Sequence, residues 1–282
     1  MNLGYYKSYA KVNIGLQILS KRPDGYHNIN TLFQEIDLYD TIKIKKIEKG
    51  CRFIANVDWL KNDDSNLCVT AWKEISKDFD VGGVSISLEK KIPRRSGLGG
   101  GSSNAATILK GICEIYSMDI TLSDLSSIAI RLGADVPFFL TGGLQSATGI
   151  GENLFTHNGC IEGSYLLVIP NHGIETSWAY SKYKNFLQTN KEALNFKDVL
   201  KDEITPFKLF ENDFEPIVIP AYPQIAKIKE MLLSSGPKYV SLSGSGSTVF
   251  GIYDDEAQAK SAESLFPEYT TFIANPIINM HL

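Results

Sequence analysis

The sequence has few cysteines and no long apolar run. Its four cysteines, Cys51, Cys68, Cys113 and Cys160, lie far apart and form no C-x-x-C pair. This spacing excludes a zinc knuckle and a disulfide framework, so we expect buried thiols in a reducing compartment. Polar or charged residues interrupt every apolar stretch before the roughly 18–20 residues that span a bilayer, and no secretory h-region follows the first residue. We therefore expect a cytoplasmic protein with no membrane partner.

The chain also lacks an excess of positive charge. Its 282 residues include 28 Lys and Arg against 32 Asp and Glu, which gives a formal net charge of −4. Because a nucleic-acid backbone is bound by a basic surface, we expect no nucleic-acid partner. Lysines at positions 43, 45, 46 and 49 are interleaved with isoleucines at strand spacing. They predict the solvated face of an edge strand rather than a basic patch.

A glycine-serine loop over residues 93–106 is the most informative feature that the sequence does contain. Four of the five residues 97–101 are glycine, which allows the main chain to approach a bulky anion with successive N–H groups. An apolar alternating segment precedes the loop and an apolar helical stripe follows it, so a helix N-terminus would add its positive end. The P-loop motif would need a lysine at Ser102 or Ser103, and G-x-G-x-x-G fails at Ser102. The loop predicts a phosphate cradle of another kind, with a flexible linker as the alternative.

The remaining pattern predicts mixed strands and helices. Alternating apolar residues indicate strands over residues 9–18, 30–37, 41–47 and 84–92. A helix is expected over residues 103–116, and a capping box at Thr121 and Asp124 predicts a second helix that ends before Gly133. A glycine-rich segment precedes a buried strand over residues 165–169, which places a domain boundary near residue 158. We expect domains over residues 1–158 and 159–282.

Three separated stretches resemble the superfamily of galactokinase, homoserine kinase, mevalonate kinase and phosphomevalonate kinase (GHMP kinases). They are Lys11 near the N-terminus, the loop of residues 93–106, and the run Ser-Gly-Ser-Gly at residues 243–246. Four motifs look more narrowly like the branch that phosphorylates a cytidyl-diphosphate sugar alcohol: AKVN at 10–13, DGYH at 24–27, GLGGGSSNAA at 97–106 and GADVPFF at 133–139. The resemblance implies an α+β fold with two domains, an N-terminal ATP-loop domain plus a ferredoxin-like C-terminal domain, with the substrate between them.

The same resemblance implies transfer of the ATP γ-phosphoryl group to the tertiary 2-hydroxyl of 4-diphosphocytidyl-2-C-methylerythritol, in the non-mevalonate isoprenoid pathway. Lys11 and Asp135 match the catalytic pair. Asp135 would accept the proton of a poorly nucleophilic alcohol, and Lys11 would keep that carboxylate ionised. Each residue has a plainer alternative, because Lys11 also fits a solvated strand position and Asp135 also fits a helix N-cap with proline in the first turn.

The resemblance further implies two sets of ligand-binding residues. The ATP phosphates would be held by Pro93, Gly97, Leu98, Gly99, Gly100, Gly101, Ser102, Ser103, Asn104, Gly244, Ser245 and Gly246. The cytidine and erythritol portions would contact Asn13, Tyr26, His27, Phe33, Thr176 and Tyr180. Mg²⁺ would be held chiefly by ATP oxygens and water, with Ser102 or Ser103 nearby and no dedicated carboxylate site. The alternatives are turn positions for Tyr26 and His27, core packing for Phe33 and Tyr180, and a β-turn between strands for residues 244–246.

One departure concerns the residues that follow Pro93. The family usually has small residues there, often glycine, whereas this chain has Arg94, Arg95 and Ser96. A left-handed backbone at Arg95 would carry strain, and an inward side chain would contact ATP phosphates. Two rival functions stay open: a kinase of the same family with another acceptor, such as mevalonate or homoserine, and a non-catalytic nucleotide sensor. A monomer and a homodimer are equally compatible with the sequence.

Overall fold

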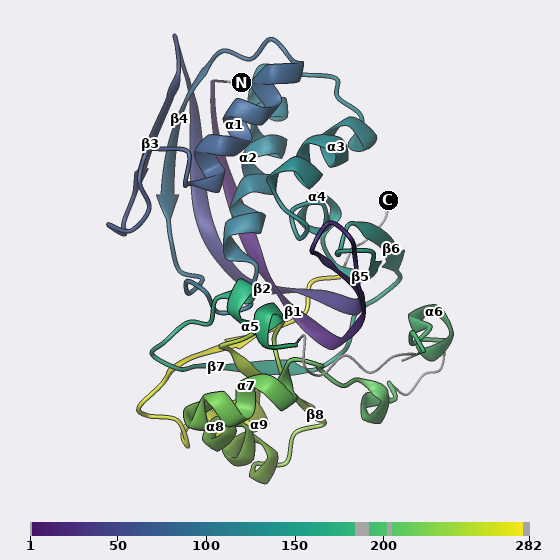
Figure 1. The fold of residues 1–282 in the computed structure, drawn as a ribbon. Helices are drawn as coiled ribbons and strands as arrows, with labels where there is room; N and C mark the ends of the chain where they lie inside the picture. Colours follow the sequence, from purple (N-terminus) through teal and green to yellow (C-terminus); the bar gives the residue numbers. More distant parts are fainter. Residues whose placement is uncertain (1, 184–191, 202–204, 279–282) are drawn as a thin grey trace. The chain divides into compact units, whose positions relative to one another are not determined.

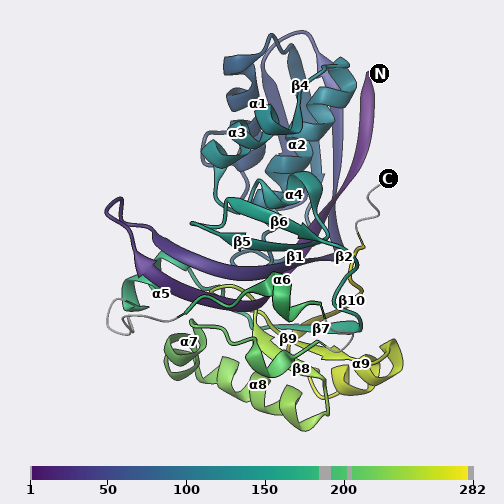
Figure 2. The same ribbon diagram turned by 90° about the vertical axis from the view of Figure 1, so that its right-hand side faces the viewer.

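The computed structural model describes residues 2–183, 192–201 and 205–278 (Figures 1 and 2). The chain forms two compact units. Unit 1 comprises Met1–Ala10, Leu38–Ile92 and Gly99–Thr141, and unit 2 comprises Lys11–Asp37, Pro93–Leu98 and Gly142–Leu282. The long strands β1 (Leu3–Lys21) and β2 (His27–Ile47) each contribute to both units. The predicted α+β class is confirmed, whereas the domain boundary near residue 158 stays a prediction.

Unit 1 is a sheet with helices on one side (Figure 1). Residues 41–47 of β2 pair antiparallel with β4 (Gly83–Glu89), and β3 (Cys51–Ala55) pairs parallel with β4. The helices are α1 (Leu67–Asp78), α2 (Gly100–Tyr116), α3 (Leu122–Leu132) and α4 (Phe138–Thr141). The edge-strand prediction for residues 41–47 is wrong, because β2 pairs with both β1 and β4. Lys43 and Lys45 are exposed because they lie on the face opposite the buried Ile42 and Ile44.

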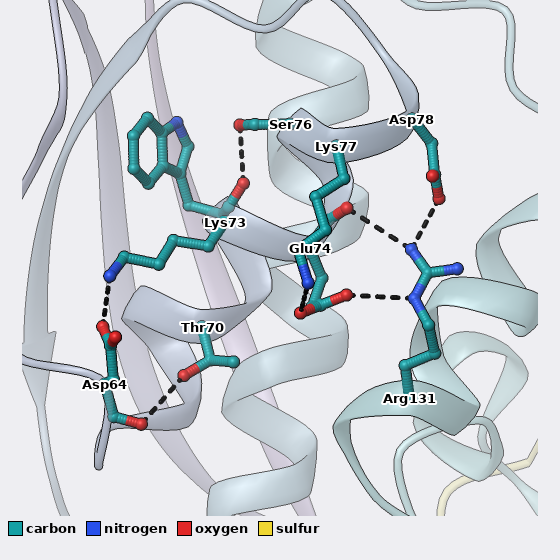
Figure 3. Close-up of polar contacts among 9 residues, drawn as sticks. Asp64, Thr70, Lys73, Glu74, Ser76, Lys77, Asp78 and Arg131 are labelled. Atoms are coloured by element: carbon teal, nitrogen blue, oxygen red, sulfur yellow. Dashed lines mark hydrogen bonds and ion pairs between the residues drawn. The ribbon is translucent and has the colours of Figure 1, made fainter.

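Helices α1 and α3 are joined by charged side chains (Figure 3). Arg131 on α3 donates to Glu74 at 3.0 Å and to Asp78 at 2.5 Å, both on α1. At the start of α3, the Thr121 hydroxyl accepts the Asp124 N–H at 3.1 Å, so the predicted cap is confirmed.

Unit 2 contains a four-stranded antiparallel sheet in the order β10-β7-β9-β8. Its strands are β7 (Ser164–Ile169), β8 (Tyr239–Leu242), β9 (Val249–Tyr253) and β10 (Thr270–Ala274). Figure 1 shows α7 (Glu215–Ala221), α8 (Pro223–Ser234) and α9 (Glu256–Glu263) on one side of it. Helices follow β7 and β9, so the chain runs in the β-α-β-β-α-β order of a ferredoxin-like domain. The predicted C-terminal architecture is confirmed.

The remaining elements of unit 2 are two strands that continue the sheet from β2 and three short helical segments. Residues 31–34 of β2 pair with β5 (Leu144–Thr148), which pairs with β6 (Asn153–His157). The short helices are α5 (Thr176–Tyr183), α6 (Phe196–Val199) and the 3₁₀ turn η1 (Phe207–Leu209). Within the described residues, no helix combines the length and the apolar character needed to cross a membrane.

The cysteine prediction is only partly correct. Cys68 is buried, but the other three cysteines are partly exposed, and all four are free thiols. Burial raises the pKa of Cys68 to about 12 and that of Cys51 to about 11.

Candidate active site

Lys11 lies on β1 with its side chain buried in unit 2. Only 4% of the residue is exposed, so the solvated alternative is wrong. Its Nζ donates to Asn13 Oδ1 at 2.5 Å and lies 5.1 Å from the centroid of the Phe33 ring. Asn13 is held in turn by Thr31 on β2, because Asn13 Nδ2 donates to Thr31 Oγ1 at 2.9 Å. Residues 11–16 of β1 are buried on both faces of the strand, which is why the alternating pattern did not reveal this environment.

Two glycine-serine loops contact each other beside Lys11. Gly97 has a φ of +78°, and Ser243 Oγ donates to Gly97 O at 2.9 Å. A Cβ on Gly97 would lie 2.0 Å from Ser243 O, so only glycine permits this approach. A Cβ on Gly244 would lie 3.2 Å from Asn13 Oδ1 and 3.7 Å from Lys11 Nζ. The backbone of the second loop therefore lies directly against the lysine and its asparagine partner.

Main-chain hydrogen bonds fix the first loop on both sides. Lys11 N–H donates to Leu98 O at 3.1 Å, and Thr248 N–H donates to Ser96 O at 3.1 Å. Ser96 Oγ donates to Pro93 O at 2.7 Å and closes the turn. Residues 93–98 are thus held from β1 and from the segment that enters β9.

The second loop is a turn between the paired strands β8 and β9, as its plainer alternative predicts. Gly246 has a φ of +92°, and Ser245 is 5% exposed. Ser245 Oγ lies 3.1 Å from Thr176 Oγ1 at the start of α5. Thr176, which was predicted to bind the acceptor, therefore contacts a residue that was predicted to bind ATP.

Residues 99–104 belong to unit 1 and begin α2. Gly99 is the N-cap with a φ of +71°, and no described side chain caps it. The first turn contains no acidic residue, so the N–H groups of Gly100, Gly101 and Ser102 form a positive helix end without a built-in anion. This end fits a phosphate group. The helix begins at Gly100 rather than at the predicted Ser103, because the left-handed Gly99 already turns the chain.

Ser103 and Asn104 are buried on the inner side of α2. Ser103 Oγ lies 2.7 Å from Ser8 Oγ, and Asn104 Nδ2 donates to Ser8 Oγ and to Asp40 Oδ2 at 2.9 Å each. Their side chains anchor the helix. Ser102 is the more exposed of the two serines predicted near Mg²⁺, and the role of all three residues in binding ATP stays a prediction.

Asp135 lies in unit 1, in the turn between α3 and α4. The turn is closed by Val136 N–H, which donates to Gly133 O at 3.1 Å. The helix begins at Phe138, so the N-cap alternative for Asp135 is wrong. Pro137 disfavours helical backbone at Val136, and this delays the helix start. Asp135 is partly exposed, and its catalytic role stays a prediction.

Aromatic side chains gather at the start of β2 and on α5. His27 is 5% exposed and stacks on Tyr180, with ring centroids 5.0 Å apart and an interplanar angle of 17°. Tyr26 is 60% exposed, and its N–H donates to Asp24 Oδ1 at 3.0 Å. Phe33 is 1% exposed, as in its core-packing alternative. The exposed ring of Tyr26 is therefore the one best placed to meet a base from solution.

Comparison with known proteins identifies the family. The GHMP kinases N terminal domain matches residues 66–143, and the GHMP kinases C terminal domain matches residues 198–269. The chain is 41% identical over 271 residues to the 4-diphosphocytidyl-2-C-methyl-D-erythritol kinase of Chlorobium phaeobacteroides (strain BS1), with 93% of each chain covered. The chain belongs to the GHMP kinase family.

Other GHMP kinases are similar to this chain in sequence and in fold. The enzyme of the same name from Chlorobaculum tepidum is 39% identical, with 92% of each chain covered. A crystal structure of 4-(cytidine 5'-diphospho)-2C-methyl-D-erythritol kinase matches with a TM-score of 0.80 and 29% identity, covering 97% of this chain and 99% of that one. Mevalonate kinase of Methanococcus jannaschii shares the fold at a TM-score of 0.72 and 15% identity, covering 97% and 98%.

Asn212 holds the second glycine-serine loop of this GHMP kinase, between β8 and β9, and the sequence did not indicate this role. It is 3% exposed, and its Nδ2 donates to Leu242 O at 2.7 Å and to Gly244 O at 2.9 Å. Its Oδ1 accepts the Phe214 N–H at 2.9 Å. Its partners lie 30 and 32 residues away in sequence, so no local pattern indicates the contact.

Asp40 is the second anchor that the sequence did not indicate. It is fully buried, and its carboxylate accepts hydrogen bonds from Lys90 Nζ at 2.5 Å, Lys91 N at 2.7 Å, Ile92 N at 2.8 Å and Asn104 Nδ2 at 2.9 Å. The pKa of Lys90 is lowered by burial, which the charge of Asp40 opposes. The Asp40 carboxylate on β2 thus bonds Ile92, just before the glycine-serine loop of residues 93–106, and Asn104 near the end of that loop.

Arg95 adopts the left-handed backbone that was one of its two predicted possibilities, with a φ of +53°. Its guanidinium forms an ion pair with Glu175 at 2.8 Å. The sequence shows that Arg95 departs from the GHMP pattern, but it does not show that Glu175, 80 residues later, is its partner.

Proposed function

We propose that this GHMP kinase transfers the γ-phosphoryl group of ATP to the 2-hydroxyl of 4-diphosphocytidyl-2-C-methyl-D-erythritol, a step of the non-mevalonate route to isoprenoids. The acceptor is inferred from relatives that carry its name and are about 40% identical over most of the chain. The observation that carries the proposal is the buried ammonium group of Lys11 beside two glycine-rich loops. An ammonium group held in a fixed position stabilises the negative charge of a transferring phosphoryl group.

We propose that Lys11 and Asp135 act together in the transfer. A tertiary alcohol is a weak nucleophile, so a carboxylate that accepts its proton lowers the barrier. Lys11 would offset the negative charge that accumulates on the reacting oxygens. Its bond to Asn13 and the packing of Phe33 hold the ammonium group in one orientation before the substrate binds.

ATP is proposed to bind through the main chain of both glycine-serine loops and the start of α2. The uncapped first turn of α2 would receive phosphate oxygens, and Gly97 and Gly244 let backbone atoms come close. Mg²⁺ would neutralise phosphate charge when bound. Ser102 is the proposed protein contact for the ion, because the Ser103 hydroxyl already bonds Ser8. Among the described residues, no cluster of three or more His, Cys, Asp or Glu is placed to hold a metal, so ATP oxygens and water would supply the other ligands.

The cytidyl end of the acceptor is proposed to bind near Tyr26, His27 and Tyr180. The stacked pair of His27 and Tyr180 offers a rigid aromatic edge, and the exposed Tyr26 ring offers a face for a base. The proposal places the enzyme in the cytoplasm, with small molecules as its partners, as a monomer or a homodimer.

The test is ADP release from Mg·ATP with the cytidyl acceptor, compared with mevalonate, homoserine and galactose. We expect turnover with the cytidyl acceptor alone. Selective turnover of another alcohol would contradict the acceptor, and nucleotide binding without turnover of any of them would support a sensor.

Variants of the proposed pair test the catalytic assignment. Lys11→Ala and Asp135→Asn should each lower kcat by about 10²–10⁴-fold, with ATP binding retained. If the two residues act on one step, the double variant should lose little more than either single variant. Lys45→Ala, which removes an exposed lysine from β2, is the matched control and should keep wild-type rates. Near-normal kcat in either single variant, or fully additive losses, would contradict the assignment.

A further inference from the structure

Arg95 connects the first glycine-serine loop, residues 93–106, to the start of α5 through three contacts. Its guanidinium bonds Glu175 at 2.8 Å, and its carbonyl oxygen accepts the Ile174 N–H at 3.1 Å. A Cβ on Gly173 would lie 2.4 Å from Arg95 Cβ, so the two backbones approach closely. Residues 173–175 are therefore seated directly on Arg95.

Stability alone does not explain an arginine at this position. Its φ of +53° is one that glycine adopts at no steric cost and other residues adopt with strain. The ion pair does not offset this strain strongly, because the Arg95 and Glu175 side chains are 47% and 55% exposed and water screens such pairs. A non-glycine residue held in this strained backbone conformation points to a role in the site.

The segment that Arg95 seats leads to the proposed acceptor-binding residues. Thr176 follows Glu175, and its Oγ1 lies 3.1 Å from Ser245 Oγ in the second glycine-serine loop. Tyr180 lies one helical turn further along α5 and stacks on His27. A shift of residues 173–175 would therefore move both contacts.

We propose that Arg95 is a positioning residue that couples the first glycine-serine loop to α5 and so sets the affinity for the cytidyl acceptor. This inference rests on the proposed function for the identity of the acceptor. In this proposal the side chain acts through its ion pair with Glu175. Its loss should therefore change the KM of the acceptor and leave kcat nearly unchanged.

The experiment compares Arg95→Gly and Glu175→Gln with the wild type. Both variants should raise the acceptor KM about two- to five-fold, the range that an exposed ion pair can account for. The wild-type KM should rise with added salt toward the value of the variants, whose KM should depend less on salt. Arg95→Lys, which keeps the charge, should recover part of the affinity.

Two control variants separate positioning from general effects. Ser117→Gly also replaces a residue of positive φ by glycine, at the end of α2. Ser117 is the other described non-glycine residue with a positive φ. Glu268→Gln breaks an ion pair with Lys227 that has the same length, 2.8 Å, and similar exposure. Both controls should keep the wild-type KM. A wild-type KM in Arg95→Gly, or an equal rise in the controls, would overturn the proposal.

Hydrogen exchange gives a readout that does not depend on turnover. The Ile174 amide should exchange faster in Arg95→Gly and Glu175→Gln than in the wild type, and its rate should not change in the two controls. Unchanged exchange in both ion-pair variants would overturn the coupling. Absence of wild-type turnover with the cytidyl acceptor would instead contradict the proposed function, so the two failures are distinguishable.

Discussion

Substitution of Gly97 by alanine is the sharpest test of the contact between the two glycine-serine loops. The added methyl group meets two penalties. The left-handed backbone, with a φ of +78°, costs a non-glycine residue about 1–2 kcal/mol. The Cβ would also lie 2.0 Å from Ser243 O, and relieving this clash by moving backbone adds about 1–3 kcal/mol. We expect Gly97→Ala to lower the free energy of unfolding by about 2–5 kcal/mol in total and to raise the KM for ATP.

Gly159→Ala provides the matched control. Gly159 has nearly the same φ, +77°, but no described atom lies within 4 Å of a Cβ built there. It should therefore lose only the backbone penalty, about 1–2 kcal/mol, with an unchanged KM for ATP. Urea unfolding and initial-rate kinetics measure both quantities. Equal destabilisation of the two variants would refute the close approach of Gly97 to Ser243.

Three further predictions concern the anchors of the site and one histidine. Asp40→Asn leaves the buried Lys90 without its charge partner and should lower the free energy of unfolding by about 3–5 kcal/mol. Urea unfolding of the Asp40→Asn, Lys90→Met double variant is the check, because its free energy of unfolding should recover. Asn212→Ala removes two hydrogen bonds to loop carbonyls and should cost about 1–3 kcal/mol, with a higher KM for ATP; a wild-type KM would contradict its role in holding the turn. Burial lowers the pKa of His157, so as the pH falls this histidine is protonated first in the unfolded chain, near the ordinary histidine pKa of about 6.5. The free energy of unfolding should therefore decrease as the pH drops below that value, until the pKa of the folded state is reached. This pH dependence should be weaker in His157→Gln.

Local patterns were sufficient to predict several elements. The capping box at Thr121, the strand over residues 165–169 and the helix after the glycine loop depend on residues close together in the sequence, and all three are confirmed. The strands expected over residues 30–37 and 41–47 are one strand, β2, because residues 38–40 contain no glycine or proline to break it. Short-range signals thus locate elements better than they separate them.

The architecture of the candidate site could not be predicted in this way. The resemblance supplied the names of Lys11 and Asp135, but the burial of Lys11 depends on packing of both faces of β1. The contact between Gly97 and Ser243 joins residues that are 146 positions apart. A motif shows that glycine is present at such a position, and only the folded chain shows which atom would collide with a side chain.

The four hydrogen bonds of Asp40 have a consequence for how the protein folds. They join Asp40 to partners 50 to 64 residues later in the chain. Contacts between residues this far apart in the sequence form more slowly than the local contacts of a single helix. On the ribosome, the carboxylate cannot acquire its full set of donors until Asn104 has been synthesised and has left the exit tunnel. The start of α2 would therefore gain its last contact with β2 late, after the helix itself can already have formed.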